Sequence, residues 1–362
     1  MKTGIRKFFD IVSEMKDAIS LGVGEPDFDT PWHIRDEGIY SLEKGKTFYT
    51  SNSGLMELRQ EICHYLKRTI HTEYDPKSEV IITVGGSEGI DIALRAMLDP
   101  GDEVLIPQPS YVSYEPCTIL AGGKPVIINL KVENEFRLTA QEILDACTEK
   151  TKVLVLPFPN NPTGAIMERS DLEAIAKVIE EKDLLVITDE IYSELSYKDK
   201  HVSIVEMPGM RERTILINGF SKAYAMTGWR LGYACGPKAV IEQMTKIHQF
   251  CIMCAPTTSQ YAAVEALKNG DVVIADTITT IIYIMTVGID NCNDAPIMES
   301  KIVEVMIDIF VFKNRVNTIA SIGNGIKKEL HSSGIIIAKE IVNADNKAII
   351  NKYSFVKYVL SK

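Results

Sequence analysis

The chain has 362 residues, of which 46% are hydrophobic and 24% charged, a composition typical of a globular protein long enough for two domains. Its formal net charge of −10 and pI near 5.3 argue against a nucleic-acid-binding protein, because such proteins are usually basic. The first residues contain no apolar signal-peptide core, and the longest apolar run, from Thr277, is too short and too threonine-rich for a membrane span. We therefore expect no nucleic acid and no membrane among its partners.

Seven cysteines, an odd number scattered over a long chain, fit reduced thiols in the cytoplasm better than a disulfide framework. Cys251 and Cys254 have the spacing of a metal-binding pair, but no second pair matches them and the six histidines form no cluster. We expect no metal site, and we interpret these two cysteines as small core residues.

From about residue 50 to 270 the chain alternates between two kinds of segment. Apolar residues recur at helical spacing in three of them, residues 54–70, 87–98 and 171–183. Between the helical patterns lie short β-branched runs, at residues 79–84, 102–109, 125–130, 152–159, 184–192 and 213–218. Near-continuous apolar strands that alternate with helices predict an α/β fold with a mostly parallel sheet covered on both faces.

The expected carboxyl ends of these strands carry the least ordinary residues in the chain. In order they read VGGSEG, PQPSYVSY, PFPNNPTG, TDEIY and NGFSK. Ligands of open α/β sheets bind beyond the carboxyl ends of the strands. The convergence of these motifs on one edge is therefore the main functional signal of the sequence.

Two of these strand ends carry chemically unusual charges. Lys222 lies in a small, apolar setting, where burial and the positive charge of Arg230 would lower its pKa enough for Schiff-base chemistry, although most buried lysines do no such chemistry. Asp189 follows four apolar residues, where an unpaired carboxylate is costly. A protonated heteroaromatic nitrogen would balance it, with the Tyr192 hydroxyl on the same ring; a helix-capping carboxylate is the alternative.

The other strand ends offer donors and an aromatic ring. Asn161 lies in a turn made rigid by proline and glycine, and either points a donor at a ring oxygen or belongs to a plain surface turn. Gly85 and Gly86 would let the backbone approach an anion, with Ser87 and a helix N-terminus as donors; the spacing suits a monophosphate better than a dinucleotide. Tyr111 either stacks on a flat ring or is a core tyrosine. Together these groups describe a pyridoxal phosphate site.

These motifs, with LGVGEPDFDTP, YTSNSGLMELR and NGFSKAYAMTGWRLGYACGPK, resemble the class I/II (fold-type I) pyridoxal-phosphate aminotransferases, in the aspartate, aromatic and acetyl-diaminopimelate branch. The resemblance covers residues 4–270 in the family's order and spacing. It implies a three-layer α/β/α large domain with a mostly parallel sheet over residues 41–270. A small α+β domain would be formed by residues 271–362 with a contribution from residues 1–40.

The resemblance also implies roles for individual residues around pyridoxal 5'-phosphate. Lys222 would form the Schiff base and shuttle the proton between the substrate Cα and C4′ of the cofactor. Asp189 would keep the pyridine nitrogen protonated, Asn161 and Tyr192 would bind the phenolic oxygen, and Tyr111 would stack on the ring. The phosphate would be held by Gly86, Ser87, Ser221 and Arg230, and by Tyr49 from the partner subunit of a homodimer. Gly24 and Asn161 would lie at the substrate.

The implied reaction moves an amino group from an L-amino acid to a 2-oxo acid, with 2-oxoglutarate as the expected acceptor. Two alternatives share the fold: a pyridoxal-phosphate C–S β-lyase, and a degraded relative that binds the cofactor with little or no activity. The degraded relative is considered because the chain changes character near residue 271. Arg315 is the only arginine after Arg230, and neither the family's GAFY-like segment nor its late carboxylate-binding arginine is visible. A frame change or a fusion is our hypothesis for that break.

Overall fold

The computed structural model describes residues 24–26, 29–196 and 200–270. The expected C-terminal domain, residues 271–362, and most of the N-terminal segment, residues 1–23, lie outside the described residues. The fold below is therefore that of the expected large domain.

The centre of this domain is a seven-stranded sheet with the order β1-β7-β6-β5-β4-β2-β3. Four neighbouring pairs are parallel, and β7 runs antiparallel to both β1 and β6. The predicted mostly parallel sheet is thus confirmed. The strands are β1 (Val80–Thr83), β2 (Glu103–Gln108), β3 (Lys124–Asn129), β4 (Thr151–Leu156), β5 (Leu185–Asp189), β6 (Thr214–Gly219) and β7 (Gly232–Cys235).

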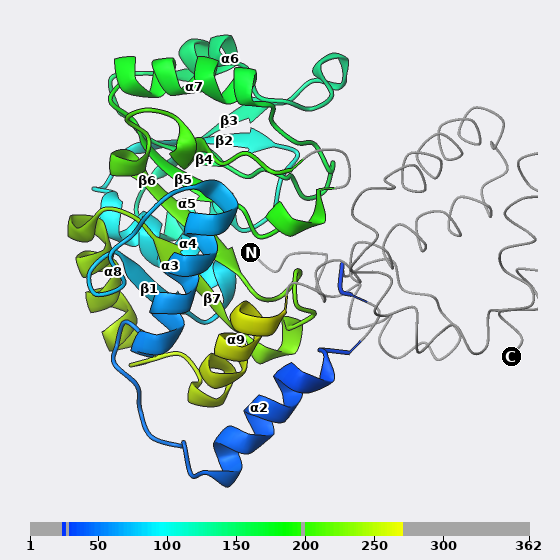
Figure 1. Cartoon of the computed structure of the whole chain (residues 1–362). Helices are drawn as coiled ribbons and strands as arrows, with labels where there is room; N and C mark the ends of the chain where they lie inside the picture. Colours follow the sequence, from blue (N-terminus) through cyan, green and yellow to red (C-terminus); the bar gives the residue numbers. More distant parts are fainter. Residues whose placement is uncertain (1–23, 27–28, 197–199, 271–362) are drawn as a thin grey trace, which may run out of the picture. The chain divides into compact units, whose positions relative to one another are not determined.

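Helices cover both faces of the sheet (Figure 1). One face carries α4 (Gly85–Met97), α5 (Tyr114–Leu120) and α8 (Lys238–Cys251). The other carries α3 (Met56–Ile70), α6 (Ala140–Ala146), α7 (Arg169–Glu181) and α9 (Thr257–Asn269), and α2 (Trp32–Glu43) packs against α9. Five 3₁₀ turns complete the described elements: η1 (Val132–Asn134), η2 (Ser193–Leu195), η3 (Ile204–Glu206), η4 (Arg211–Arg213) and η5 (Thr227–Trp229).

Consecutive strand residues pack into opposite cores, which explains the near-continuous apolar runs. In β5, Val186 joins the core under α3 and α7, whereas its neighbour Ile187 joins the core under α4 and α8. Side chains alternate between the faces of a strand, so a sheet covered on both sides needs apolar residues at every position. Asp189, the last residue of β5, is polar and still buried, which makes it an exception that needs a reason.

Two features differ from the sequence-based expectations. Strand β7 was not among the expected strands, because it has only four residues and begins with glycine. The interpretation of Cys251 and Cys254 as core residues is wrong: Cys251 is exposed at the end of α8 and Cys254 is half-buried.

In the part of the chain that the structure describes, no helix is both long enough and apolar enough to cross a membrane.

Glycines allow the start of α4 to lie directly against the sheet. A Cβ atom on Gly232 would be 2.7 Å from the Gly85 carbonyl carbon and from the Gly86 nitrogen, and 3.0 Å from the Asn218 oxygen. All three neighbours are backbone atoms, which cannot rotate away as a side chain can. Only glycine therefore fits at residue 232 while α4 starts where it does.

We expect Gly232→Ala to destabilise the fold by about 1–3 kcal/mol, the usual cost of overpacking, because backbone must move to admit the methyl group. Urea unfolding measures this change. Gly228→Ala is the matched control, since a Cβ there meets nothing within 4 Å. Equal midpoints for the two variants would contradict the close approach of α4 and β7.

Candidate active site

The carboxyl edge of the sheet brings most of the expected site residues together. Lys222 follows β6, Asp189 ends β5, and Tyr192 lies in the turn after β5. Asn161 and Tyr111 come from the connections that follow β4 and β2. Parallel strands point their carboxyl ends to the same edge, so this grouping follows from the topology of the sheet.

Lys222 lies half-buried in the turn after β6, and its Nζ donates a hydrogen bond to the Gly24 carbonyl oxygen. The same Nζ is 5.7 Å from the centre of the Tyr192 ring. Burial lowers the pKa of Lys222; Glu25 acts in the opposite direction, and Arg230 lowers the pKa further. The neutral, nucleophilic amine is therefore more accessible than in an ordinary lysine.

Asp189 is buried at the end of β5, and two donors hold its carboxylate. The Tyr114 hydroxyl donates to Oδ2 at 2.8 Å, and the backbone N–H of Ile191 donates to Oδ1 at 3.2 Å. Burial raises the pKa of Asp189, while both hydrogen bonds lower it and Glu190 raises it. No ion pair joins Asp189 to a lysine or arginine of the described residues. An external cation would compensate this carboxylate.

Two hydroxyl-bearing pairs flank the strand end of Asp189. The Asn161 amide Nδ2 donates to the Tyr192 hydroxyl at 3.4 Å, and the hydroxyls of Tyr111 and Ser87 are 3.2 Å apart. Burial raises the pKa of Tyr192, as do Asp189 and Tyr111, whereas Asn161 lowers it. Tyr111 is half-buried, so its ring is neither a core residue nor fully solvated.

The anion cup lies at the start of α4, where Gly86 and Ser87 occupy the first helical turn. The backbone N–H groups of a first turn have no partner within the helix and favour an anion. Arg230 is exposed, and its Nη1 donates to the Thr227 carbonyl at 3.0 Å. Its Nη2 lies so close to Gly85 that a Cβ there would be 2.7 Å away. The guanidinium is thus held directly over the start of the helix.

Of the remaining expected residues, two lie beside Lys222 and one has no hydrogen bond to the other candidate residues. Ser221 is half-buried next to Lys222, and Gly24 accepts the lysine hydrogen bond described above. Tyr49 is 78% exposed on the loop after α2, and no hydrogen bond links it to the other candidate residues within the described chain. Its expected place in a partner's site stays a prediction.

Sequence reasoning missed Tyr114, although it selected the stretch that contains it. Tyr114 lies three residues after Tyr111, its ring meets that of Tyr111 edge to face at 5.7 Å, and its buried hydroxyl reaches Asp189. A buried tyrosine needs a hydrogen-bond partner, and the spacing from Tyr111 was the available signal. Sequence reasoning also missed Gly232, which lets the start of α4 approach the sheet, because Gly232 belongs to the short strand β7 that was not expected.

Comparison with known proteins gives the family of this fold and site. Residues 16–284 match the family described as aminotransferase class I and II. The chain belongs to this family. It is a pyridoxal-phosphate-dependent aminotransferase, as its motifs predicted, and the match ends at residue 284, shortly after the composition of the chain changes.

Relatives in each of the three expected branches support this membership. An aspartate aminotransferase of Pyrococcus abyssi is 50% identical over 266 residues, which are 73% of this chain and 68% of that protein. A Bacillus subtilis protein called "Probable N-acetyl-LL-diaminopimelate aminotransferase" is 45% identical over 268 residues, 74% and 67% of the two chains. The crystal structure of an aromatic aminotransferase from Pyrococcus horikoshii has a TM-score of 0.71 and 46% identity, and covers 75% of this chain and 73% of that one.

The residues of this chain fit pyridoxal phosphate. Asp189 is a buried carboxylate without a cation among the described residues, as a partner for a protonated pyridine nitrogen must be. Gly85 leaves room that a side chain would fill, between the first turn of α4 and the Arg230 guanidinium, where a phosphate suits the donors. Lys222 is half-buried with a lowered pKa, as an amine that reacts with an aldehyde requires.

We expect Tyr114→Phe to weaken cofactor binding by on the order of 10- to 100-fold, since a hydrogen bond to a charged group contributes about 1.5–3 kcal/mol. Without the tyrosine donor the pKa of Asp189 rises further, so less of it is ionised and the loss grows as the pH falls. Equilibrium dialysis with pyridoxal phosphate between about pH 6 and 8.5 measures the effect.

Tyr74→Phe is the matched control, because the Tyr74 hydroxyl is buried and has no hydrogen-bond partner among the described residues. Cofactor affinity should be unchanged in that variant. A pH-independent loss in Tyr114→Phe would show that the hydroxyl does not act through Asp189.

Proposed function

We propose that this enzyme transfers the amino group of an L-amino acid to 2-oxoglutarate in the cytoplasm, as a homodimer, with Lys222 as the covalent attachment point of the cofactor. The observation that carries the proposal is the half-buried Lys222 amine of lowered pKa, which faces the Tyr192 ring beside the strand end of Asp189. The cytoplasmic location is inferred from an odd number of cysteines without a disulfide framework.

When bound, the cofactor supplies an aldehyde for the amino group and an electron sink for the substrate's Cα–H bond. Asp189 would hold a proton at the pyridine nitrogen, and the hydrogen bond that Tyr114 donates to its carboxylate favours the ionised form. Lys222 Nζ would act as the base that takes the proton from the substrate Cα, and as the acid that returns this proton in the same reaction. Burial keeps this amine neutral often enough to act as a base.

The other residues bind and orient. Asn161 and Tyr192, linked by their 3.4 Å contact, would bind the phenolic oxygen of the ring, and Tyr111 would pack against the ring. Ser87, Ser221, the Gly86 N–H and Arg230 hold the phosphate. These contacts fix the ring, so that the Cα–H bond of the substrate is presented to Lys222.

The substrate is bound, in this proposal, near Gly24 and Asn161. The Gly24 carbonyl contacts Lys222, so this short segment borders the position where the amino acid reacts. Aspartate, aromatic amino acids and N-acetyl-diaminopimelate appear in the names of the relatives and are the first donors to test with 2-oxoglutarate. Release of pyruvate from a β-substituted amino acid would instead indicate the β-lyase, and a cofactor-loaded but inert protein the degraded relative.

We expect Lys222→Ala to lose the visible absorption of the attached cofactor and to lose amino transfer almost completely, because no amine remains to bind the aldehyde or move the Cα proton. Absorption spectra with and without amino donors measure both effects. Lys246→Ala, the same change at an exposed position of α8, is the control and should behave as the unmodified enzyme. Partial recovery of the half-reaction on addition of a small free amine would assign the lost step to proton transfer.

The homodimer is supported by an exposed apolar surface on α2 and the loop after it. Trp32, Ile39, Tyr40, Leu42, Phe48 and Tyr49 form this group, and Phe48 and Tyr49 are 80% and 78% exposed. Exposed apolar groups of this kind mark protein–protein contacts.

An open groove of about 610 Å³ is lined by Thr30, Trp229 and Ser259 among others, and it reaches Arg230. In our proposal, this groove gives a side chain of the partner subunit a path to the phosphate.

A mixture of Lys222→Ala and Tyr49→Ala subunits tests the shared site. In a two-fold dimer, one site of each mixed dimer receives an intact Lys222 from one subunit and an intact Tyr49 from the other. We expect activity above that of either parent after the two are unfolded and refolded together. Activity no higher than that of the unmixed Tyr49→Ala enzyme would mean that Tyr49 serves its own subunit or no site.

A further inference from the structure

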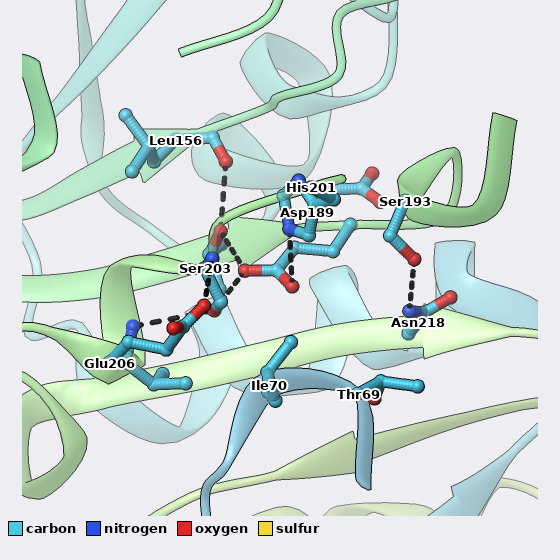
Figure 2. A network of polar contacts seen from close by, with 12 residues as sticks. Thr69, Ile70, Leu156, Asp189, Ser193, His201, Ser203, Glu206 and Asn218 are labelled. Atoms are coloured by element: carbon cyan, nitrogen blue, oxygen red, sulfur yellow. Dashed lines mark hydrogen bonds and ion pairs between the residues drawn. The ribbon is translucent and has the colours of Figure 1, made fainter. Parts of the chain in front are cut away.

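Two buried carboxylates follow each other at the end of β5, and the function proposed above uses only one of them. Asp189 is 7% and Glu190 is 2% exposed. Asp189 accepts from Tyr114 of α5, on one face of the sheet, whereas Glu190 contacts His201 and Ser203, from the segment after η2. Figure 2 shows Asp189 beside this network of polar contacts.

The Glu190 carboxylate is held by two hydroxyl donors and by one ion pair. Ser203 Oγ donates to Oε1 at 2.5 Å and Thr188 Oγ1 donates to the same oxygen at 3.1 Å. His201 Nε2 lies 2.9 Å from Oε2 as an ion pair, and the Glu190 N–H donates to the Ile217 carbonyl at 2.9 Å. The last contact extends the β5–β6 ladder by one residue, so this network fixes the end of the strand that carries Asp189.

The charge of Glu190 matters to its neighbour. Glu190 is among the groups that raise the pKa of Asp189, after burial, and a raised pKa opposes the ionised form. Burial is the largest single effect on the pKa of His201 and lowers it, but Glu190, Glu206 from η3 and Glu194 from η2 together raise this pKa above the ordinary value of a histidine. His201 therefore carries a positive charge next to Glu190 over a wider pH range than an ordinary histidine would.

We propose that His201 and Glu190 are positioning residues for Asp189: they hold the end of β5 and cancel the negative charge beside Asp189, so that its carboxylate stays ionised for the pyridine nitrogen. The inference rests on the proposed role of Asp189. Glu190 anchors the strand end through its hydrogen bonds, and His201 offsets the electrostatic cost that Glu190 would impose on Asp189. The other titratable side chains that interact with Asp189 are Tyr114 and Tyr192, neither of which supplies a positive charge.

The experiment compares two ligands in the full-length chain: pyridoxal phosphate and its carbocyclic analogue, in which C–H replaces the ring nitrogen. Both carry the same aldehyde and phosphate, so the ratio of their dissociation constants isolates the contact to Asp189. Asp189→Asn is the reference variant and should remove most of the preference for pyridoxal phosphate. In His201→Gln we expect the preference to fall on the order of 10-fold, because the charge of Glu190 is then uncompensated and opposes the ionised form of Asp189.

The double variant Glu190→Gln/His201→Gln provides the rescue. It removes both charges together, while the glutamine can still accept from the two hydroxyls, so the preference for pyridoxal phosphate should return toward that of the unmodified enzyme. His248→Gln is the matched control. The His248 side chain is fully buried and that of His201 is 12% exposed, and the His248 Nδ1 lies 2.8 Å from Glu88. Glu88, unlike Glu190, is not among the groups that shift the pKa of Asp189, so the preference should not change.

The pH dependence of the preference for pyridoxal phosphate is a second measurement, and it does not require the variants to be equally stable. His201 is charged below its raised pKa and loses the proton as the pH rises through it, so the advantage of the unmodified enzyme over His201→Gln should shrink at high pH. Equal weakening of both ligands in His201→Gln, or a preference that the double variant does not restore, would overturn the inference while leaving the role of Asp189 intact. If Asp189→Asn itself keeps the preference, the proposed role of Asp189 is wrong and the inference fails with it.

Discussion

The burial of the Asp189 carboxylate is the constraint on which the rest of the site depends. A carboxylate removed from water at the end of a central strand is costly unless donors and a cation compensate it. Tyr114 and the Ile191 N–H supply two donors, and the described chain supplies no cation in contact with it. The site is therefore complete only when a positively charged group lies against Asp189. A protonated pyridine ring would meet this need, and in our proposal residues at the neighbouring strand ends bind its other substituents.

The same topology explains why the helpers of Asp189 come from both faces of the sheet. Because strand side chains alternate, the residue after Asp189 points to the opposite side of the strand, and a polar residue there must be satisfied by a different set of elements. Glu190 meets that demand through Ser203 and His201, from a segment that follows the site in sequence. The end of β5, where Asp189 lies, thus depends on contacts on both sides of the strand.

The sequence was sufficient to predict the elements with strong periodicity. The helical patterns at 54–70, 87–98 and 171–183 correspond to α3, α4 and α7, because each has an apolar stripe that the sheet buries. Strand β7 has too few residues for a pattern, and its existence depends on pairing with β1 and β6. Residues that act on the ligand were visible as polar groups at apolar strand ends. In our proposals Tyr114 and His201 act through Asp189, and such roles depend on three-dimensional contacts that spacing alone does not reveal.

Arg230 illustrates how function overrides local preference in this fold. It adopts a left-handed backbone conformation, with φ of 51° and ψ of 57°, which costs a residue with a side chain roughly 1–2 kcal/mol. Glycine would adopt that conformation freely, but it would leave the start of α4 without a guanidinium. On the opposite side, Gly85, with φ of 73°, gives up its side chain so that the Arg230 Nη2 can approach. The chain thus places arginine where glycine would be easier and glycine where the arginine must fit. An arginine in this conformation is explained if it binds the phosphate, as we propose, because an exposed guanidinium contributes little to stability by itself.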